Sequence, residues 1–490
     1  MGQDVEAREF SGEDRARYRA KVHRNLDVLA TMLGSHDFSV PDPHVGIEIE
    51  FNLVDDEGDP ALRNSETLEA IADEDFQTEL GQFNVEINVP PAPVAGRGLA
   101  DMADQMRDDL NAAQEKARSV GTGLMMIGIL PTLRPGHFTR ETISANPRYH
   151  LLSEQILAAR GEDIDIVING VERLRTTVDT IIAEAACTST QLHLQVEPDE
   201  FAPTWNAAQA IAGVQVAVAA NSPFLLGKRL WHETRIALFE QATDTRTEEL
   251  KAQRVRPRVW FGERWITSVF DLFEENSRYF PALLPIVDEE DPVEELKAGR
   301  IPSLAELRLH NGTIWRWNRP IYDVVDGRPH LRIENRLLPA GPTVRDTVAN
   351  AALFYGLVTA LTEQERPVWS QMSFGAAEDG FHAAAAEGIE SEVFWPGVGS
   401  VPVRELVLRH LLPLAHVGLE RRGVDSAVID EFLQIIERRC VTGRNGATWL
   451  SEQFEWLHGG GDVFDTMRAV TRRYAEHMHS GIPVHEWPVD

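Results

Sequence analysis

The sequence predicts an α+β protein. An antiparallel sheet is expected in a body formed by residues 1–342, and a helical part formed by residues 343–490 is expected to pack on it. Two patterns predict this organisation. Four segments before residue 342 alternate apolar and polar residues, as strands do in an antiparallel sheet with one wet face. After residue 342, apolar residues recur at helical spacing in nearly every segment.

Helices are expected before and between the strands of the body. Residues 12–33 and 99–120 place apolar side chains at helical spacing, and residues 203–220 and 266–280 indicate two further helices. Residues 124–132 are a short apolar run and predict a buried strand.

The four strand segments share a polar face of unusual composition. Glu, Asn, Gln, His and Arg occupy these faces and lysine is nearly absent, whereas a plainly solvated strand face prefers Thr, Lys and Ser. Glu48 and Glu50 are two positions apart in the first segment, so both point to one face. The segments are "GIEIEFNLV" (46–54), "FNVEINVPP" (83–91), "TQLHLQVEP" (190–198) and "HLRIENRLLP" (330–339).

If these segments lie in one sheet, their polar faces form one concave wall rich in carboxylates. Clustered carboxylates raise one another's pKa unless a cation compensates their charge. Mg²⁺ or Mn²⁺ fits oxygen ligands, and one histidine is compatible with Mn²⁺. Arginines beside such metals indicate a phosphate, so the wall has the equipment for phosphoryl transfer from ATP. No GxxxxGK[ST] or kinase-type GxGxxG occurs, so the nucleotide is expected on the sheet.

Each feature also has a plainer interpretation. A single alternating strand is more often a solvated face than a site, and a lone histidine such as His193 is more often a hydrogen-bonded core residue. Arg332 and Arg336 flank Glu334 and could form only a structural ion network with it. Glu79 could be a polar residue before a turn.

Charge and cysteine content narrow the class of partners. The 47 basic and 77 acidic residues give a net charge of −30, which argues against nucleic acids and anionic membranes as partners. Cys187 and Cys440 form no CxxC pair and suit a reducing cytosol. The N-terminal segment lacks the apolar core of a signal peptide, and residues 210–227 predict a buried helix and a turn. A cytoplasmic location without a membrane span is therefore expected.

Five motifs occur in the order expected of one family. They are "GIEIEFNLVD", "ELGQFNVEINVPP", "TQLHLQV", "NSPFLLGKRLWHETR" and "LRIENRLLPAGPTVRD", within about residues 40–365. In this order they resemble the glutamate–cysteine ligase type of carboxylate–amine ligases, which are related in fold to glutamine synthetase. The resemblance implies a curved, largely antiparallel sheet with helices on its other face. The concave face would bind Mg²⁺, ATP and glutamate.

The resemblance also assigns roles to individual residues. Arg336 matches an arginine that contacts the phosphates of the nucleotide, and Arg332 is a second candidate for the nucleotide and for catalysis. Arg235 matches an arginine of the glutamate or phosphate site. Arg148 in "NPRYH" is a further candidate for the nucleotide, with a surface helix start as the plainer interpretation. The matched metal ligands are Glu48, Glu50, Glu79, Glu86, His193 and Glu334.

The implied reaction joins glutamate to an amine at the expense of ATP, through an acyl phosphate, with cysteine as the leading amine. Three alternatives stay open: the same chemistry with another amine or carboxylate, a non-catalytic regulator that binds glutamate or nucleotide, and a guanidino kinase. Residues 310–328 could line the substrate pocket through Arg316, Trp317 and Arg319, or form a packed aromatic hairpin. The helical part could mediate homo-oligomerisation or only cover the sheet.

Overall fold

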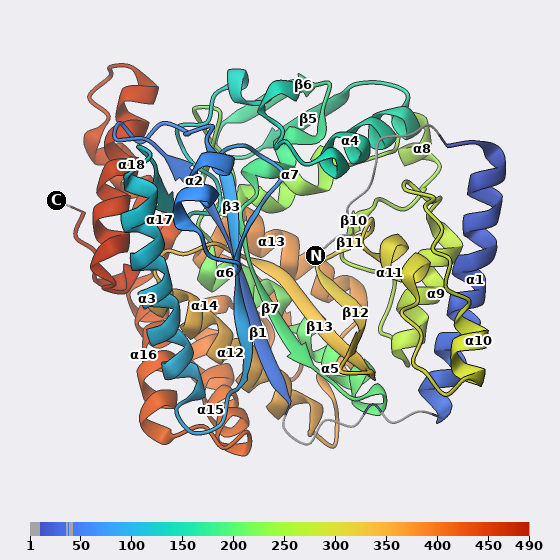
Figure 1. Ribbon diagram of the computed structural model, residues 1–490. Helices are drawn as coiled ribbons and strands as arrows, with labels where there is room; N and C mark the ends of the chain where they lie inside the picture. The colour runs from blue at the N-terminus through green and yellow to red at the C-terminus, as the bar shows by residue number, and fades with distance from the viewer. Residues whose placement is uncertain (1–9, 36–37, 39–42, 490) are drawn as a thin grey trace.

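A computed structural model describes residues 10–35, 38 and 43–489. Among these residues, seven strands form one antiparallel sheet with the order β12-β13-β7-β1-β3-β2, and β4 pairs with the end of β1. Figure 1 shows β1, β7, β13 and β12 side by side through the middle of the molecule. The strands of this sheet are β1 (His44–Val54), β2 (Phe76–Thr78), β3 (Asn84–Pro93), β4 (Gly123–Met125), β7 (Ser189–Gln195), β12 (Asn318–Val325) and β13 (Arg328–Pro339).

The alternation in β1 decides which of its side chains enter the core. Ile47, Ile49 and Phe51 are buried on one side of the strand. Because successive side chains of a strand point to opposite faces, Glu48 and Glu50 lie on the other side. The predicted antiparallel sheet with one apolar and one polar face is confirmed.

Helices cover the apolar side of the sheet and flank its two ends. The hydroxyl of Tyr355 on α12 donates to the backbone carbonyls of Gly46 on β1 (3.4 Å) and His193 on β7 (3.3 Å), which fixes α12 across both strands. Figure 1 shows α3, α16, α17 and α18 at the left of the sheet and α1, α9 and α10 at the right. The helices are α1 (Gly12–Ser35), α2 (Asn64–Ile71), α3 (Gly98–Arg118), α4 (Pro147–Arg160), α5 (Pro198–Ala210), α6 (Ala212–Ala219), α7 (Thr234–Ala242), α8 (Glu248–Ala252), α9 (Val269–Tyr279), α10 (Pro292–Lys297), α11 (Ala305–Asn311), α12 (Val344–Thr362), α13 (Phe374–Glu387), α14 (Val403–Leu406), α15 (Leu412–Arg421), α16 (Ser426–Thr442), α17 (Gly446–Leu457) and α18 (Val463–Ser480).

One connected hydrophobic core runs through the described residues from the N-terminal helix to the C-terminal helices. It includes Leu29 of α1, Ile49 of β1, Phe354 of α12 and Trp449 of α17. The helices that follow β13 therefore pack against the same core as the sheet, which holds the polar face in place from behind.

Two predicted elements differ from those observed. The helix predicted over residues 203–220 is two helices, because Ile211 (φ −97°, ψ 3°) leaves the helical conformation between α5 and α6. The strand predicted over residues 124–132 is limited to β4. Beyond β4 the chain leaves β1, and the amide of Gly128 donates instead to the carbonyl of Asn221 (3.2 Å).

The helical part also contains a short hairpin that the sequence analysis did not predict. It is formed by β14 (Glu392–Trp395) and β15 (Gly399–Pro402). No helix within the described part of the chain has the length and apolar character needed to span a membrane.

Candidate active site

A cavity of about 400 Å³ lies over the polar side of the sheet. The sheet strands form its floor, and its walls come from the N-terminal end of α4, from the 3-10 helix η3 (Ile181–Ala186) and from the segment around β11 (Trp315–Arg316). Five carboxylates and three guanidinium groups line this one space. They are Glu48, Glu50, Glu79, Glu86, Glu184, Arg148, Arg319 and Arg336.

Three of these carboxylates converge on one point. Glu50 of β1, Glu86 of β3 and Glu79, which follows β2, each offer an oxygen, and these oxygens all lie within 4.8 Å of one another. The strand register is the cause, because Glu50 and Glu86 are direct partners in the β1–β3 ladder. We call Glu50, Glu79 and Glu86 the carboxylate trio.

The carboxylate trio is electrostatically unfavourable without a cation. Burial raises the pKa of Glu79 to about 7, and the charge of Glu50 adds to this effect. Burial, then the charges of Glu48 and Glu79, raises the pKa of Glu86 well above its ordinary value. Burial also raises the pKa of Glu50, although Arg336 opposes the shift. Mg²⁺ prefers carboxylate oxygens, so the trio fits a hard divalent cation.

Neighbouring groups hold each carboxylate of the trio in place. Glu50 accepts hydrogen bonds from the Ser189 amide (2.7 Å), the Ser189 hydroxyl (3.0 Å) and Gln191 Nε2 (2.8 Å) on β7. Glu79 accepts from the amide of Leu80 (2.9 Å), and Glu86 accepts from Asn88 Nδ2 (3.0 Å). The trio is therefore preorganised by the protein and does not depend on mobile side chains.

Glu48 lies beside the trio but is paired with a histidine. His193 Nε2 lies 3.0 Å from Glu48 Oε1, and His193 Nδ1 accepts from Arg332 Nε (3.1 Å). Burial raises the pKa of Glu48, but the interaction with His193 outweighs burial and lowers it to about 2. Since Nδ1 accepts a hydrogen bond from Arg332 Nε, it carries no proton, and the ring proton sits on Nε2 in this arrangement. His193 can bind a metal through Nε2 only if Arg332 moves away.

Glu334 carries the densest set of arginine contacts at the site. Arg319 on β12 donates through Nε (2.7 Å) and Nη2 (2.9 Å) to its two oxygens, and Arg336 pairs with it from the same strand. Burial opposes ionisation, but Arg319 and Arg336 hold the pKa of Glu334 well below its ordinary value. Both arginines face the cavity, where they place positive charge next to the trio.

The N-terminal end of α4 forms the rim of the cavity opposite the sheet. Asn146 caps the helix by accepting from the amide of Arg148 (3.0 Å), and the hydroxyl of Tyr149 donates to the carbonyl of Thr78 (3.2 Å). Arg148 and Tyr149 therefore line the cavity rather than only starting a surface helix.

Two predicted arginines do not line the cavity. Arg235 is buried on α7, where Nε donates to Glu233 Oε1 (3.0 Å) and Nη2 donates to the carbonyl of Leu337. Its guanidinium group thus holds β13 in place from within the core and faces no open space. Arg332 contacts His193 and Asp323 (3.5 Å) along the strand face beside the cavity.

The segment 310–328 contains both a packed aromatic part and a residue that lines the cavity, the two alternatives left open by its sequence. Arg316 is buried against Glu275 (2.9 Å), and Trp317 packs edge-on against Phe239 with ring centroids 5.7 Å apart. These two residues form a packed aromatic structure. Arg319, by contrast, lines the cavity.

Sequence reasoning missed Glu184, Thr243 and Trp315, which also line the cavity. Glu184 lies in the apolar run "IIAEAAC", and a single charged residue in such a run is a signal that could have identified it. Thr243 and Trp315 carry no comparable sequence signal, because each is one polar or aromatic residue among many.

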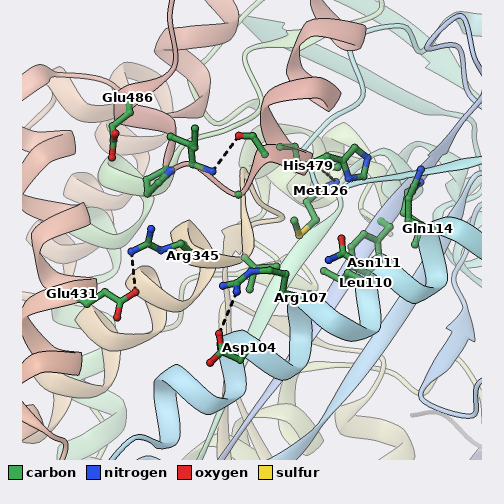
Figure 2. A pocket seen from close by; sticks show the side chains of 18 residues that line it. Asp104, Arg107, Leu110, Asn111, Gln114, Met126, Arg345, Glu431, His479 and Glu486 are labelled. Carbon is green, nitrogen blue, oxygen red and sulfur yellow. Dashed lines mark hydrogen bonds and ion pairs between the residues drawn. The ribbon is translucent and has the colours of Figure 1, made fainter.

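A second and larger cavity, of about 660 Å³, lies on the helix-covered side of the sheet. Figure 2 shows its two arginines paired with acids: Arg107 with Asp104 (3.2 Å) and Arg345 with Glu431 (2.9 Å). Among the described residues, the trio is the only group of three or more His, Cys, Asp or Glu side chains close enough to share a cation, and it lies in the other cavity. We therefore take the 400 Å³ cavity as the candidate active site.

Comparison with known families agrees with the motifs on the sheet. The model of glutamate–cysteine ligase family 2 (GCS2) matches residues 44–470. The chain belongs to this family. The match begins at β1 and extends into α18, so it includes the whole sheet and the cavity above it. The resemblance inferred from the five motifs is confirmed.

Two curated relatives of the chain share part of its length. Both are named as glutamate–cysteine ligase 2-2, from Mycobacterium sp. strain KMS and strain JLS, and each is 30% identical over 160 residues. The aligned region is 29% of this chain and 42% of each relative.

Two solved structures share the fold of this GCS2 protein at low identity. The AMP complex of glutamate–cysteine ligase from Francisella tularensis gives a TM-score of 0.56 at 10% identity, covering 93% of this chain and 91% of that one. A bifunctional glutathione synthetase from Pasteurella multocida gives a TM-score of 0.51 at 12% identity, covering 94% of this chain and 55% of that one. These similarities support the predicted ligase fold with its curved antiparallel sheet.

Proposed function

We propose that the protein is an ATP-dependent carboxylate–amine ligase that activates the γ-carboxylate of glutamate and joins it to an amine. The observation that carries the proposal is the carboxylate trio, with oxygens within 4.8 Å of one another, in one cavity with Arg148, Arg319 and Arg336. Carboxylates for a divalent cation and arginines for phosphate are the recurring parts of phosphoryl-transfer sites.

The trio would hold the first divalent cation, Mg²⁺ or Mn²⁺. Glu48, His193 and Glu334 lie next to it on the same polar face and would complete the metal site where Arg332 and Arg319 release them. When bound, the cation would neutralise phosphate oxygens of ATP and reduce the repulsion between the two negatively charged reactants.

The arginines would hold the phosphates during transfer. Arg336 and Arg319 project from adjacent strands into the cavity, and Arg148 faces them from the rim, so the three can surround a triphosphate. The γ-carboxylate oxygen of glutamate attacks the γ-phosphorus and ADP leaves, which gives an acyl phosphate. The amine loses its ammonium proton, and its neutral nitrogen attacks the acyl carbon. Phosphate departs with the electron pair of the C–O bond and takes up the second proton that the nitrogen gives up as the amide forms. The buried walls limit hydrolysis of the intermediate by water.

Cysteine is the amine we propose first, because the family and the named relatives point to it. The decisive experiment measures phosphate release by the purified protein with Mg²⁺, ATP and glutamate, with and without a panel of amines headed by cysteine. Mass spectrometry identifies the product. The control is the Glu86→Gln variant, which should remove release that depends on the trio and leave any contaminating ATPase unchanged.

Each outcome decides between the alternatives. Cysteine-dependent release with a γ-glutamyl product supports the full proposal. Phosphate release that depends on another amine or another carboxylate would support the same reaction with a different substrate. Tight binding of ATP or glutamate without any release would contradict the ligase and favour a regulatory protein.

A further inference from the structure

One carboxylate of the cavity differs from the others in its contacts. Glu48, Glu50, Glu79 and Glu86 each have a hydrogen-bond or ion-pair partner on the protein. Glu184 also lines the cavity, but within the described part of the chain its carboxylate has no hydrogen-bond donor and no ion-pair partner. Glu184 is half-buried, and a cationic ligand in the cavity would give its carboxylate the partner that the protein does not supply.

A second polar group of the same cavity is also left without a partner. Thr243, at the end of α7, is 1% exposed, and among the described residues its hydroxyl has no hydrogen-bond partner. Helix α7 packs against η3, the element that carries Glu184. Buried hydroxyls are nearly always hydrogen-bonded, so the free hydroxyl indicates a ligand that donates or accepts at this wall.

A cation paired with Glu184 would be distinct from one held by the trio. Glu184 is not one of the three carboxylates whose oxygens lie within 4.8 Å of one another. It is nevertheless close enough for Glu79 and Glu50 to act on it: burial, then the charges of Glu79 and Glu50, raises the pKa of Glu184 to about 8. A cation beside Glu184 would therefore lie next to the proposed metal site and the activated carboxyl group.

The charges of the reactants indicate which of them would lie beside Glu184. ATP and the reacting carboxylate are anions, whereas a primary amine is an ammonium ion in neutral water. The amine must approach the acyl carbon to within about 3–3.5 Å before it can attack. The α-ammonium of glutamate lies three carbons away from the reacting carboxyl group, so the attacking amine is the cation expected next to it.

We propose that Glu184 and Thr243 form the subsite for the amine substrate, with Glu184 pairing with its primary ammonium group. This inference rests on the proposed ligase function. Ile181, on the same 3-10 helix, and Trp315 also line the cavity and give the carbon body of the amine an apolar surface. Glu184 is thus a specificity-determining residue that favours amines that are charged in water.

The test compares the wild type with Glu184→Gln, which keeps the shape of the side chain and removes its charge. Both are assayed with two ammonium-bearing amines, cysteine and ethylamine, and with hydroxylamine, which is mostly uncharged at neutral pH and traps the acyl phosphate as a hydroxamate. The variant should raise the KM of the better ammonium-bearing amine about 10- to 100-fold, as expected for a lost charge-assisted hydrogen bond. Hydroxamate formation and the KM of ATP should stay within about 2-fold of the wild type.

Further variants separate the subsite from a structural or metal-binding role. Glu184→Asp keeps the charge and should restore part of the amine affinity, and Thr243→Val should raise the KM of the amine by less than Glu184→Gln does. Glu115→Gln, at an exposed position of α3, is the matched control and should change nothing. Thermal unfolding should show that Glu184→Gln is folded, because the variant removes a charge that its neighbours disfavour.

Three results would overturn the subsite. Unchanged amine KM in Glu184→Gln would show that the carboxylate does not bind the amine. An equal loss with hydroxylamine, or a shift in the Mg²⁺ dependence, would assign Glu184 to the phosphoryl-transfer step or to the metal. If the wild type forms no hydroxamate and releases no phosphate, the proposed ligase function itself fails and the subsite fails with it.

Discussion

At the scale of single residues, the site combines two opposite electrostatic environments on adjacent strands. The carboxylate trio has no arginine in ion-pair contact among the described residues, and burial raises the pKa of each of its members. Glu334 is held by Arg319 and Arg336, which keep its pKa low. Neighbouring acids whose pKa values are shifted in opposite directions are typical of functional sites. In a part of the protein that serves stability alone, such charges would be paired or absent.

Replacing Glu86 by glutamine should raise the thermal stability of the metal-free protein and lower its ligase activity. The change removes one of three mutually repelling charges, so in EDTA the melting temperature should rise by about 1–3 °C. Ligase activity should fall about 100-fold or more, because the cation loses a ligand. Thermal unfolding with and without Mg²⁺, together with the phosphate-release assay, measures both effects. A variant that melts lower in EDTA and keeps full activity would contradict the metal assignment.

Arg319→Lys should affect the nucleotide rather than the fold. Lysine keeps the charge but cannot make the two parallel hydrogen bonds that Arg319 makes with Glu334. We expect kcat/KM for ATP to fall about 10- to 100-fold with little change in melting temperature. Arg316→Lys is the matched control, since Arg316 is buried in the same segment against Glu275 and does not line the cavity. That control should instead lower stability.

At the scale of elements, strand register and helix packing place the trio. The pairing of Glu50 with Glu86 and of Glu334 with His193 puts four site residues in facing positions on two strand pairs, β1–β3 and β13–β7. A shift of one residue would turn each side chain to the apolar side. Helix α12 prevents such a shift, because Tyr355 contacts β1 and β7 together.

The packing of α12 on α15 depends on two glycines. A Cβ atom added at Gly418 would overlap the carbonyl oxygen of Gly356, so the two helices can approach this closely only without it. Gly418→Ala should therefore lower the free energy of unfolding by about 1–3 kcal/mol or more, measured by urea denaturation. Gly375, inside α13, has open space around it, and Gly375→Ala should be neutral or stabilise by up to about 1 kcal/mol. Equal effects of the two substitutions would contradict this packing argument.

At the scale of the whole molecule, the raised pKa values link stability, pH and metal. A carboxyl group whose pKa is higher in the folded state binds more protons when folded, so stability falls as pH rises from its ordinary value through its raised value. For Glu79 this window runs from 4.5 to about 7. The metal-free protein should thus be less stable at about pH 8 than at about pH 5.

Binding of Mg²⁺ should reverse this pH dependence. The cation replaces the protons on the trio, so its binding near pH 7 should release protons and raise the melting temperature most at high pH. Calorimetry in buffers of different ionisation enthalpy measures the protons released. Proton uptake on binding, or a melting temperature independent of Mg²⁺ at about pH 8, would contradict a metal site at the trio.

The sequence by itself determined the strands, their polar faces and most of the charged residues that meet at the cavity, because alternation and residue type are local properties of the chain. Glu48, Glu50 and Glu86 could be identified from their strands alone. The lengths of the elements over residues 124–132 and 203–220 were not predictable in this way, since tertiary contacts decide where a strand or helix ends.

Only the tertiary structure decided which charged groups face open space and which are buried against a partner. Arg235 and Arg319 look equally suited to phosphate in the sequence, yet Arg235 is buried against Glu233 while Arg319 faces the cavity. Glu184 and Thr243 join the cavity only through the packing of η3 and α7. Such contacts depend on the mutual placement of segments far apart in the chain, and local sequence patterns carry no information about that placement.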